Sequence, residues 1–274
     1  MKKFEGMLFC TDLDGTLYSD DRTVSKQNLD AIEYFKSEGG LFTFITGRVP
    51  LTAASICDTI KPNAPYGCLN GGGIFDPAKN EYLWKMVLPD EFTEIIRDID
   101  EQMPEVGIHY NAPYQIYFLN DNIVWDFFRK ITGVEGVKCR FGDVKEPVMK
   151  VVFGTHEEST MQKLIAFLKE HPRSKDFDFI RSEQMLYELL PKGASKGNAL
   201  YKMAELFSID KKRTVAVGDY NNDISMIKAA GLGFAVSNAV PELKAASDLE
   251  TVSNNEHAIA AIIDGLDTGK YEIF

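Results

Sequence analysis

Short apolar segments that end in polar residues constrain the fold of this chain more than any other feature. Three of them are residues 7–10, 41–45 and 214–217. Apolar runs of this length favour strands that are buried on both faces of a parallel sheet. Segments with apolar residues at helical spacing follow them, as at residues 26–38. The alternation of strands and helices predicts βαβ units around a parallel sheet.

The alternation changes between residues 83 and 190. Pairs of consecutive β-type runs lie in this block, the first within residues 106–119 and the second within residues 177–190. Adjacent β-type runs joined through helices indicate a mostly antiparallel sheet. We therefore predict an α/β protein with a parallel-sheet core, formed by residues 1–82 and 191–274, and an inserted α+β domain at residues 83–190.

Two carboxylates stand directly after the first predicted strand. Asp12 and Asp14 are separated by Leu13, and Gly15 then allows the backbone to turn sharply. Side chains two positions apart in an extended segment point the same way, so both carboxylates can address one small volume. A divalent cation, or a proton held by one of them, would relieve their repulsion. An ordinary acidic turn explains the same residues, because Asp and Gly are common in turns.

Two further predicted strands lead to polar residues. Thr46 follows residues 41–45, and Asp219 lies just beyond residues 214–217. Open parallel sheets bind ligands outside the carboxyl ends of their strands. Aspartate oxygens suit Mg²⁺, and an aspartate can also attack phosphorus and form an acyl phosphate. These strand ends therefore hold parts that phosphoryl transfer requires.

Charge and cysteine content limit the partners. The formal net charge of -11 argues against nucleic acid or an anionic membrane surface as a partner. An anionic substrate remains compatible, because a metal ion and a few lysines reverse the local field. The chain has no CxxC motif, which favours a reduced, cytoplasmic location. Its first apolar run is too short for a signal peptide, and none approaches membrane-spanning length.

Four motifs together resemble those of the haloacid dehalogenase-like phosphatases, in particular the Cof-type members with a large α/β cap inserted after the second motif. They are Asp12-Leu13-Asp14-Gly15-Thr16-Leu17, Ile45-Thr46-Gly47-Arg48, Lys192-Gly193-Ala194-Ser195-Lys196-Gly197 and Gly218-Asp219-Tyr220-Asn221-Asn222-Asp223. Each motif alone is a weak or moderate signal, but all four occur in order over essentially the whole chain. The resemblance implies a Rossmann-like core and, at residues 83–190, a cap that selects the substrate.

The resemblance also implies an activity. The chain would be a Mg²⁺-dependent phosphatase of small phosphomonoesters, with sugar phosphates as the leading class. Asp12 would attack phosphorus and become an aspartyl phosphate. Asp14 would protonate the leaving oxygen and then deprotonate the hydrolytic water. Asp12 must be ionised while Asp14 starts with a proton, and different environments for neighbouring carboxyl groups produce such a division.

Ligands for the metal and the phosphate follow from the same resemblance. Asp12, the backbone carbonyl of Asp14, and Asp219 would hold Mg²⁺, and Asp223 would support that shell or join it through water. The phosphate oxygens would be bound by residues of the second, third and fourth motifs, namely Thr46, the amide of Gly47, Lys196 and, as a candidate neighbour, Asn222. Each of these residues also has an ordinary structural reading, as a strand end, a solvated helix residue or a helix cap.

Several roles stay open at this level. Lys192 is the rival of Lys196 for the phosphate-binding role, but it lies a little early in the motif. A cation in the first turn of a helix opposes the helix dipole, which favours a functional role for Lys196. Arg48 contacts phosphate or forms a structural ion pair. Four aromatic residues line a pocket or, as is usual in strands, pack a sheet: Tyr110, Tyr114, Tyr117 and Phe118. Surface or capping roles are expected for the four histidines: His109, His156, His171 and His257.

Two alternative functions accompany the phosphatase. A phosphomutase acting on phosphosugars fits, because related folds return the phosphoryl group to the substrate. A non-catalytic, metabolite-binding regulatory module of the same fold is the other alternative. Asp12 and Asp14 argue against it, because a binding protein needs neither a nucleophile nor an acid. A small phosphorylated metabolite is the expected partner, whereas its identity and the oligomeric state stay open.

Overall fold

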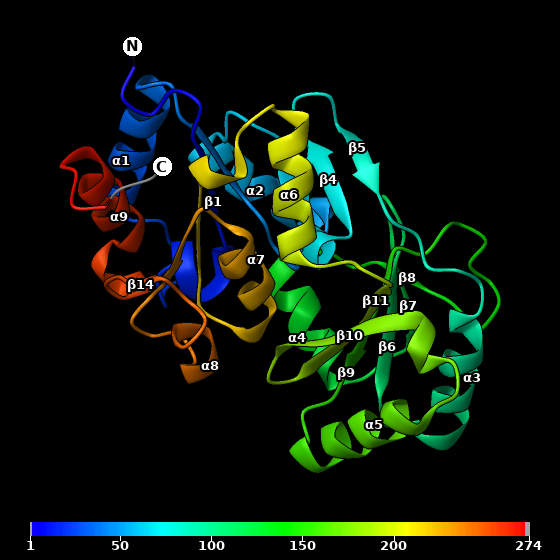
Figure 1. The fold of residues 1–274 in the computed structure, drawn as a ribbon. Coiled ribbons are helices and arrows are strands. Elements are labelled where there is room, and N and C mark those ends of the chain that lie inside the picture. Colours follow the sequence, from blue (N-terminus) through cyan, green and yellow to red (C-terminus); the bar gives the residue numbers. More distant parts are fainter. Residues whose placement is uncertain (1, 272–274) are drawn as a thin grey trace. The chain divides into compact units, whose positions relative to one another are not determined.

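The structure, a computed structural model, describes residues 2–271. The chain divides into two compact units (Figure 1). The first, called the core unit here, consists of Met1–Gly47, Ala53–Trp84 and Ser195–Phe274. The second, called the cap unit, consists of Arg48–Thr52 and Lys85–Ala194. Its main segment, Lys85–Ala194, begins and ends a few residues after the predicted inserted domain at residues 83–190.

A five-stranded parallel sheet forms the centre of the core unit, in the order β14-β13-β12-β1-β2. The strands are β1 (Leu8–Thr11), β2 (Leu41–Phe44), β12 (Thr214–Gly218), β13 (Leu232–Ala235) and β14 (Leu249–Glu250). All four residues of β1 are fully buried, as expected for a strand covered on both faces. β1 lies in the interior of the sheet, between β2 and β12, and the predicted parallel sheet is confirmed.

Within residues 2–271, six α-helices lie wholly or mostly in the core unit. They are α1 (Lys26–Ser37), α2 (Pro50–Ile60), α6 (Lys196–Leu206), α7 (Ile224–Ala229), α8 (Pro241–Lys244) and α9 (Ala258–Asp267). α1 and α9 lie side by side, and so do α6 and α7 (Figure 1). Two serines begin helices as N-caps: Ser25 Oγ accepts from the amide of Asn28 at 3.2 Å, and Ser195 Oγ accepts from that of Asn198 at 3.1 Å.

A separate three-stranded sheet was not predicted. It consists of β3 (Tyr66–Cys68), β4 (Gly73–Asp76) and β5 (Glu81–Lys85). The alternation of strands and helices in the sequence predicts a further parallel strand at residues 66–69, but these residues pair mainly in an antiparallel hairpin. β3 pairs antiparallel with β4, and a single parallel bridge between Ile45 and Gly67 joins it to the segment after β2. The glycine-rich turn before β4 hid this hairpin, because such a stretch is typical of a loop.

The cap unit contains a six-stranded sheet in the order β10-β11-β9-β6-β7-β8, antiparallel except between β7 and β8. Its strands are β6 (Gly107–Asn111), β7 (Ile116–Asn120), β8 (Val137–Lys138), β9 (Lys150–Gly154), β10 (Phe177–Glu183) and β11 (Leu186–Pro191). Its helices are α3 (Phe92–Gln102), α4 (Ile123–Thr132) and α5 (Glu158–Glu170). α3 and α5 lie beside the sheet (Figure 1), and their apolar residues pack with those of the strands in one buried cluster. The predicted inserted α+β domain is confirmed.

His109 corrects the expectation for the histidines. It is only 3% exposed, and its ring stacks on Trp125 of α4 with centroids 4.4 Å apart and planes within 12°. Among the aromatic residues left open, Tyr110 and Phe118 are buried, which fits packing, whereas Tyr114 is 57% exposed. No helix within residues 2–271 is long and apolar enough to cross a membrane.

Candidate active site

Three of the predicted site residues lie at one edge of the parallel sheet of the core unit. Thr11 at the end of β1 pairs with Phe44 of β2 and with Val217 of β12. Asp12, Thr46 and Asp219 follow these three strand ends. Because the strands are parallel and in this register, the three residues leave the sheet at its carboxyl edge.

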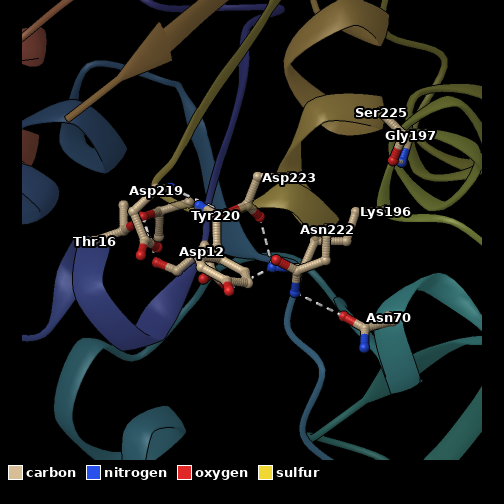
Figure 2. A network of polar contacts seen from close by, with 11 residues as sticks. Asp12, Thr16, Asn70, Lys196, Gly197, Asp219, Tyr220, Asn222, Asp223 and Ser225 are labelled. Atoms are coloured by element: carbon tan, nitrogen blue, oxygen red, sulfur yellow. Dashed lines mark hydrogen bonds and ion pairs between the residues drawn. The ribbon is translucent and has the colours of Figure 1, made fainter. Parts of the chain in front are cut away.

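Lys196 joins two aspartates of this edge (Figure 2). Its Nζ lies 2.7 Å from Asp12 Oδ1 and 2.6 Å from Asp223 Oδ1. Lys196 is 1% exposed, Asp12 6% and Asp223 0%, so these charges are held away from bulk water. Lys196 is the first residue of α6, where a cation opposes the helix dipole, and the two carboxylates offset that cost. The structure thus brings the first, third and fourth motifs together.

Asp223 also orders the loop that carries Asp219. Its Oδ2 accepts from the backbone amides of Asp219 at 3.0 Å and Tyr220 at 3.1 Å. A Cβ atom on Gly218 would lie 2.4 Å from Asp223 Cγ, so the loop closes this tightly only with glycine at that position. Both oxygens of Asp223 are therefore engaged by the protein, which fits the supporting role better than that of a direct metal ligand.

Thr16 and Gly15 connect the first motif to Asp219. Thr16 Oγ1 donates to Asp219 Oδ1 at 2.9 Å. Gly15 has a φ of 75°, and a Cβ there would lie 2.5 Å from Asp219 Oδ2. The turn after β1 therefore needs glycine both for its left-handed conformation and for the close approach of the carboxylate. The contact fixes one oxygen of Asp219 and its orientation.

Asp12, Asp219 and Asp223 carry more negative charge than Lys196 offsets. Burial raises the pKa of the Asp12 carboxyl well above its usual range, the charge of Asp223 adds to the rise, and Lys196 opposes both. Burial and the charge of Asp223 likewise raise the pKa of Asp219 to about 7. Burial alone would lower the pKa of Lys196, but Asp12 and Asp223 outweigh it and raise that pKa. A further cation beside these carboxyl groups would favour their ionised forms.

The donor set fits a hard divalent cation. Asp12, Asp219 and Asp223 each offer one carboxylate oxygen, and these atoms all lie within 4.8 Å of one another. Lys196 occupies Asp12 Oδ1 and Thr16 occupies Asp219 Oδ1. Within residues 2–271, the other oxygen of Asp219 has no hydrogen-bond partner, so it is the atom of that residue best placed to take a metal. An all-oxygen set of this kind suits Mg²⁺.

Asp14 is placed differently from Asp12. It lies in the turn after β1 with an extended backbone (φ -75°, ψ 126°) and a half-buried side chain. Its carboxylate does not belong to the group of three that can share a metal ion, but its charge helps to raise the pKa of Asp219. Asp14 is thus near the cluster and more exposed to solvent, as an acid that exchanges protons with water requires.

Asn70 belongs to the site, although sequence reasoning assigned it no role. Asn222 Nδ2 donates to Asn70 Oδ1 at 3.0 Å (Figure 2), and the amide of Asn70 donates to the carbonyl of Thr46 at 3.0 Å. A Cβ atom on Gly47 would lie 3.1 Å from the side chain of Asn70. Asn70 therefore connects the two phosphate-binding candidates of the second motif to Asn222. The sequence signal was only an Asn-Gly pair, which is typical of any tight turn.

The two lysines of the third motif have different partners. Lys192, the rival of Lys196, pairs with Asp178 at 2.8 Å, and its side chain is 62% exposed.

Arg48 donates to the carbonyl oxygen of Thr52 at 3.4 Å. Cys10 is fully buried in β1, and burial raises the pKa of its thiol, as expected for a packing residue.

Comparisons with known proteins agree with this geometry. A sequence model of the haloacid dehalogenase-like hydrolase family matches residues 9–263. The chain is 29% identical over 267 residues to "Putative phosphatase YxeH" of Bacillus subtilis, covering 94% of this chain and 97% of that protein. It is 28% identical over 285 residues to 5-amino-6-(5-phospho-D-ribitylamino)uracil phosphatase YwtE of the same species, covering 95% and 98%.

Solved structures show the same fold. The chain matches TM0651 from Thermotoga maritima with a TM-score of 0.80 at 24% identity, over 94% of this chain and 96% of that one. It matches the subclass IIB sugar phosphatase BT4131 with a TM-score of 0.84 at 21% identity, over 95% and 99%. A parallel-sheet core with an inserted α+β domain, the four motifs and the family match lead to one assignment. The chain belongs to the haloacid dehalogenase-like hydrolases, and within them to the Cof-type phosphatases.

Proposed function

We propose that this protein is a Mg²⁺-dependent phosphatase that hydrolyses small phosphomonoesters through an aspartyl phosphate on Asp12. The observation that carries the proposal is the buried cluster in which Lys196 contacts Asp12 and Asp223, beside Asp219. A nucleophile, a cation and a set of metal ligands meet there from segments that are far apart in sequence.

Asp12 is the nucleophile in this proposal. Lys196 holds its Oδ1, which leaves Oδ2 to attack phosphorus in line with the ester oxygen. The bond between phosphorus and that oxygen breaks as the bond to Oδ2 forms. Asp14 gives its proton to the leaving alkoxide, so the alcohol departs neutral. The phosphoryl group is then carried on Asp12.

The second half of the reaction regenerates the enzyme. Asp14, now a carboxylate, takes a proton from a water molecule, and the water oxygen attacks phosphorus. The bond between phosphorus and Oδ2 of Asp12 breaks, which releases inorganic phosphate and restores the Asp12 carboxylate. Asp14 is protonated again at the end of this step, ready for the next substrate.

Four groups bind the phosphoryl oxygens in this scheme: the Thr46 hydroxyl, the Gly47 amide, the Lys196 ammonium and the Asn222 carboxamide. In the proposal these groups act where the transition state spreads its negative charge. Mg²⁺, held by Asp12, the carbonyl of Asp14, and Asp219, would neutralise phosphate charge when bound. Asp223 keeps Lys196 and the loop of Asp219 in place.

Phosphorylated sugars and polyols are the substrate class we propose. The name of YwtE describes a substrate with a phosphorylated ribityl chain, and this relative covers nearly the whole protein. BT4131, of the same fold, is described as a sugar phosphatase. A protein with a net charge of -11 needs a local cationic site to bind such anions, and Lys196 with Mg²⁺ provides one.

A panel of phosphorylated metabolites tests the proposal. It contains sugar phosphates, sugar bisphosphates and 5-amino-6-(5-phospho-D-ribitylamino)uracil, and released phosphate is measured with and without Mg²⁺. We expect Mg²⁺-dependent release that Asp12→Asn abolishes. Borohydride reduction during turnover, followed by mass spectrometry, should convert Asp12 to homoserine, because acyl phosphates are reduced by this reagent.

Other outcomes would overturn the proposal in different ways. Isomerised sugar phosphate without released phosphate, formed only with a bisphosphate present, would identify a phosphomutase. Tight binding of a metabolite, with no turnover of any ester in the panel, would identify a regulatory module. Homoserine at a residue other than Asp12 would show that the nucleophile is misassigned.

A further inference from the structure

The turn Leu69–Gly71 has an unusual backbone. Its three residues have successive φ angles of 56°, 53° and 91°, so all lie in the left-handed region. Glycine adopts this region readily and asparagine tolerates it, but a leucine there is strained. Strain of this kind persists only where the surroundings over-determine it, and it collects at functional sites. The contacts around the turn must therefore hold it in this conformation.

Three site segments of the core unit surround this turn. The amide of Asn70 donates to the carbonyl of Thr46 at 3.0 Å. A Cβ atom on Gly71 would lie 2.0 Å from the backbone oxygen of Ser195, so the turn directly abuts the start of α6, which carries Lys196. The side chain of Asn70 contacts Asn222. The turn thus touches the second, third and fourth motifs at once.

The contact between Asn70 and Asn222 fixes the orientation of a carboxamide. Asn70 is 1% exposed and Asn222 7%, so bulk water does not compete for their hydrogen bonds. Asn70 Oδ1 accepts one N–H of Asn222 at 3.0 Å, which leaves the second N–H of that amino group for another acceptor. Asn222 Oδ1 is buried and has no hydrogen-bond partner within residues 2–271. Without the acceptor on Asn70, the amide plane of Asn222 would be free to rotate.

We propose that Asn70 is a positioning residue, which holds the carboxamide of Asn222 so that its remaining N–H faces a phosphate oxygen. This inference rests on the proposed function of the site. Asparagine combines two properties that the position requires, namely tolerance of left-handed backbone and a neutral acceptor. Glycine would keep the backbone and lose the acceptor, whereas aspartate would keep the acceptor and bring a negative charge close to the bound phosphate.

Asn70→Gly is the test substitution, because it removes the side chain without straining the backbone. Asn80→Gly is its matched control: Asn80 also has a left-handed φ, of 55°, but it is exposed in the turn between β4 and β5. We expect Asn70→Gly to weaken the binding of inorganic phosphate in the presence of Mg²⁺ by about tenfold, the effect of one lost hydrogen bond. KM should rise similarly, with a smaller change in kcat.

A double-mutant cycle separates positioning from general stability. If Asn70 acts through Asn222, Asn222→Ala alone and the double variant Asn70→Gly/Asn222→Ala should bind phosphate equally weakly. Calorimetry measures this binding without turnover, and the melting temperature of each variant checks the fold. Independent, additive losses, or an Asn70→Gly protein that binds phosphate as the wild type does, would overturn the inference. A wild-type protein that neither binds nor releases phosphate would instead overturn the proposed function.

Discussion

Lys196 Nζ and Asp12 Oδ1 lie 2.7 Å apart, although 184 positions separate the two residues in the sequence. The same ammonium group contacts Asp223, and all three side chains are buried. One cation therefore serves two buried carboxylates. Removing one partner of such a group leaves uncompensated charge in a poorly solvated place, which is more damaging than the loss of an exposed ion pair.

Lys196→Met should remove the phosphate-binding cation while keeping most of the side-chain volume. We expect kcat/KM to fall by about 10²- to 10³-fold, the usual effect of losing one donor to transition-state charge. Lys192→Met, at the exposed lysine that pairs with Asp178, is the control and should stay close to the wild-type value. Equal losses in the two variants would contradict the assignment of Lys196.

Asp14→Asn should abolish proton transfer and leave the metal site largely intact. We expect kcat to fall by about 10²- to 10⁴-fold, the range attributed to general acid–base catalysis. Mg²⁺ affinity should change little, because the proposal uses only the backbone carbonyl of this residue. Parallel steady-state kinetics and Mg²⁺ titration calorimetry check both parts. Near-normal turnover would refute the role of Asp14.

Thr16→Val should weaken metal binding by removing the hydrogen bond that orients Asp219. Partners of metal ligands typically contribute about 10- to 100-fold to metal affinity, so we expect a loss in this range in a Mg²⁺ titration. Thr43→Val is the matched control, because Thr43 is also fully buried and donates to the carbonyl of Pro65 in the core unit. Removal of Mg²⁺ with a chelator should stop turnover in all three proteins.

His109 should make the cap unit sensitive to acid. Burial keeps its pKa well below the usual range, and the nearby cations Lys150 and Arg129 lower it further. Below about pH 6.5 the unfolded chain therefore binds a proton that the folded chain does not. The free energy of unfolding should fall by up to about 1.4 kcal/mol for each pH unit below that value.

His109→Phe removes this linkage and keeps an aromatic ring against Trp125. Melting temperatures measured by calorimetry between pH 7.5 and 5 should fall less steeply in this variant than in the wild type. His156→Gln, at an exposed histidine beside Glu157, should retain the wild-type slope. Parallel curves for the wild type and His109→Phe would show that His109 binds a proton without unfolding.

The sequence predicted most of the architecture that places the candidate site. Asp12, Thr46 and Asp219 follow short apolar runs, and parallel strands deliver their carboxyl ends to one edge. Local pattern alone was therefore enough to expect these side chains near each other. The roles of Lys196 and Asn222 depended on a family resemblance, because a lysine or an asparagine at a helix start has ordinary explanations.

Other features depend on contacts that no local pattern records. Asn70 lies in an Asn-Gly turn, and its importance comes from Asn222, which is 152 positions away. His109 is a polar residue, for which the sequence favours an exposed position, but its ring stacks on Trp125 of α4 and is buried. The glycine-rich turn before β4 hid the hairpin of β3 and β4, because such a stretch is typical of a loop. Tertiary packing decided each of these cases, which is why they could not be predicted.

The position of β1 in the sheet has a consequence for biosynthesis. One neighbour, β2, is made soon after it, but the other, β12, begins only at Thr214. Lys85–Ala194, which form most of the cap unit, leave the ribosome in between and can fold as a nearly continuous segment. Until then the strand that carries the nucleophile keeps one edge of unpaired backbone groups, which is prone to aggregation. We therefore expect the nascent chain to gain its reactive centre late in translation, and truncated chains that lack residues 195–274 to be insoluble.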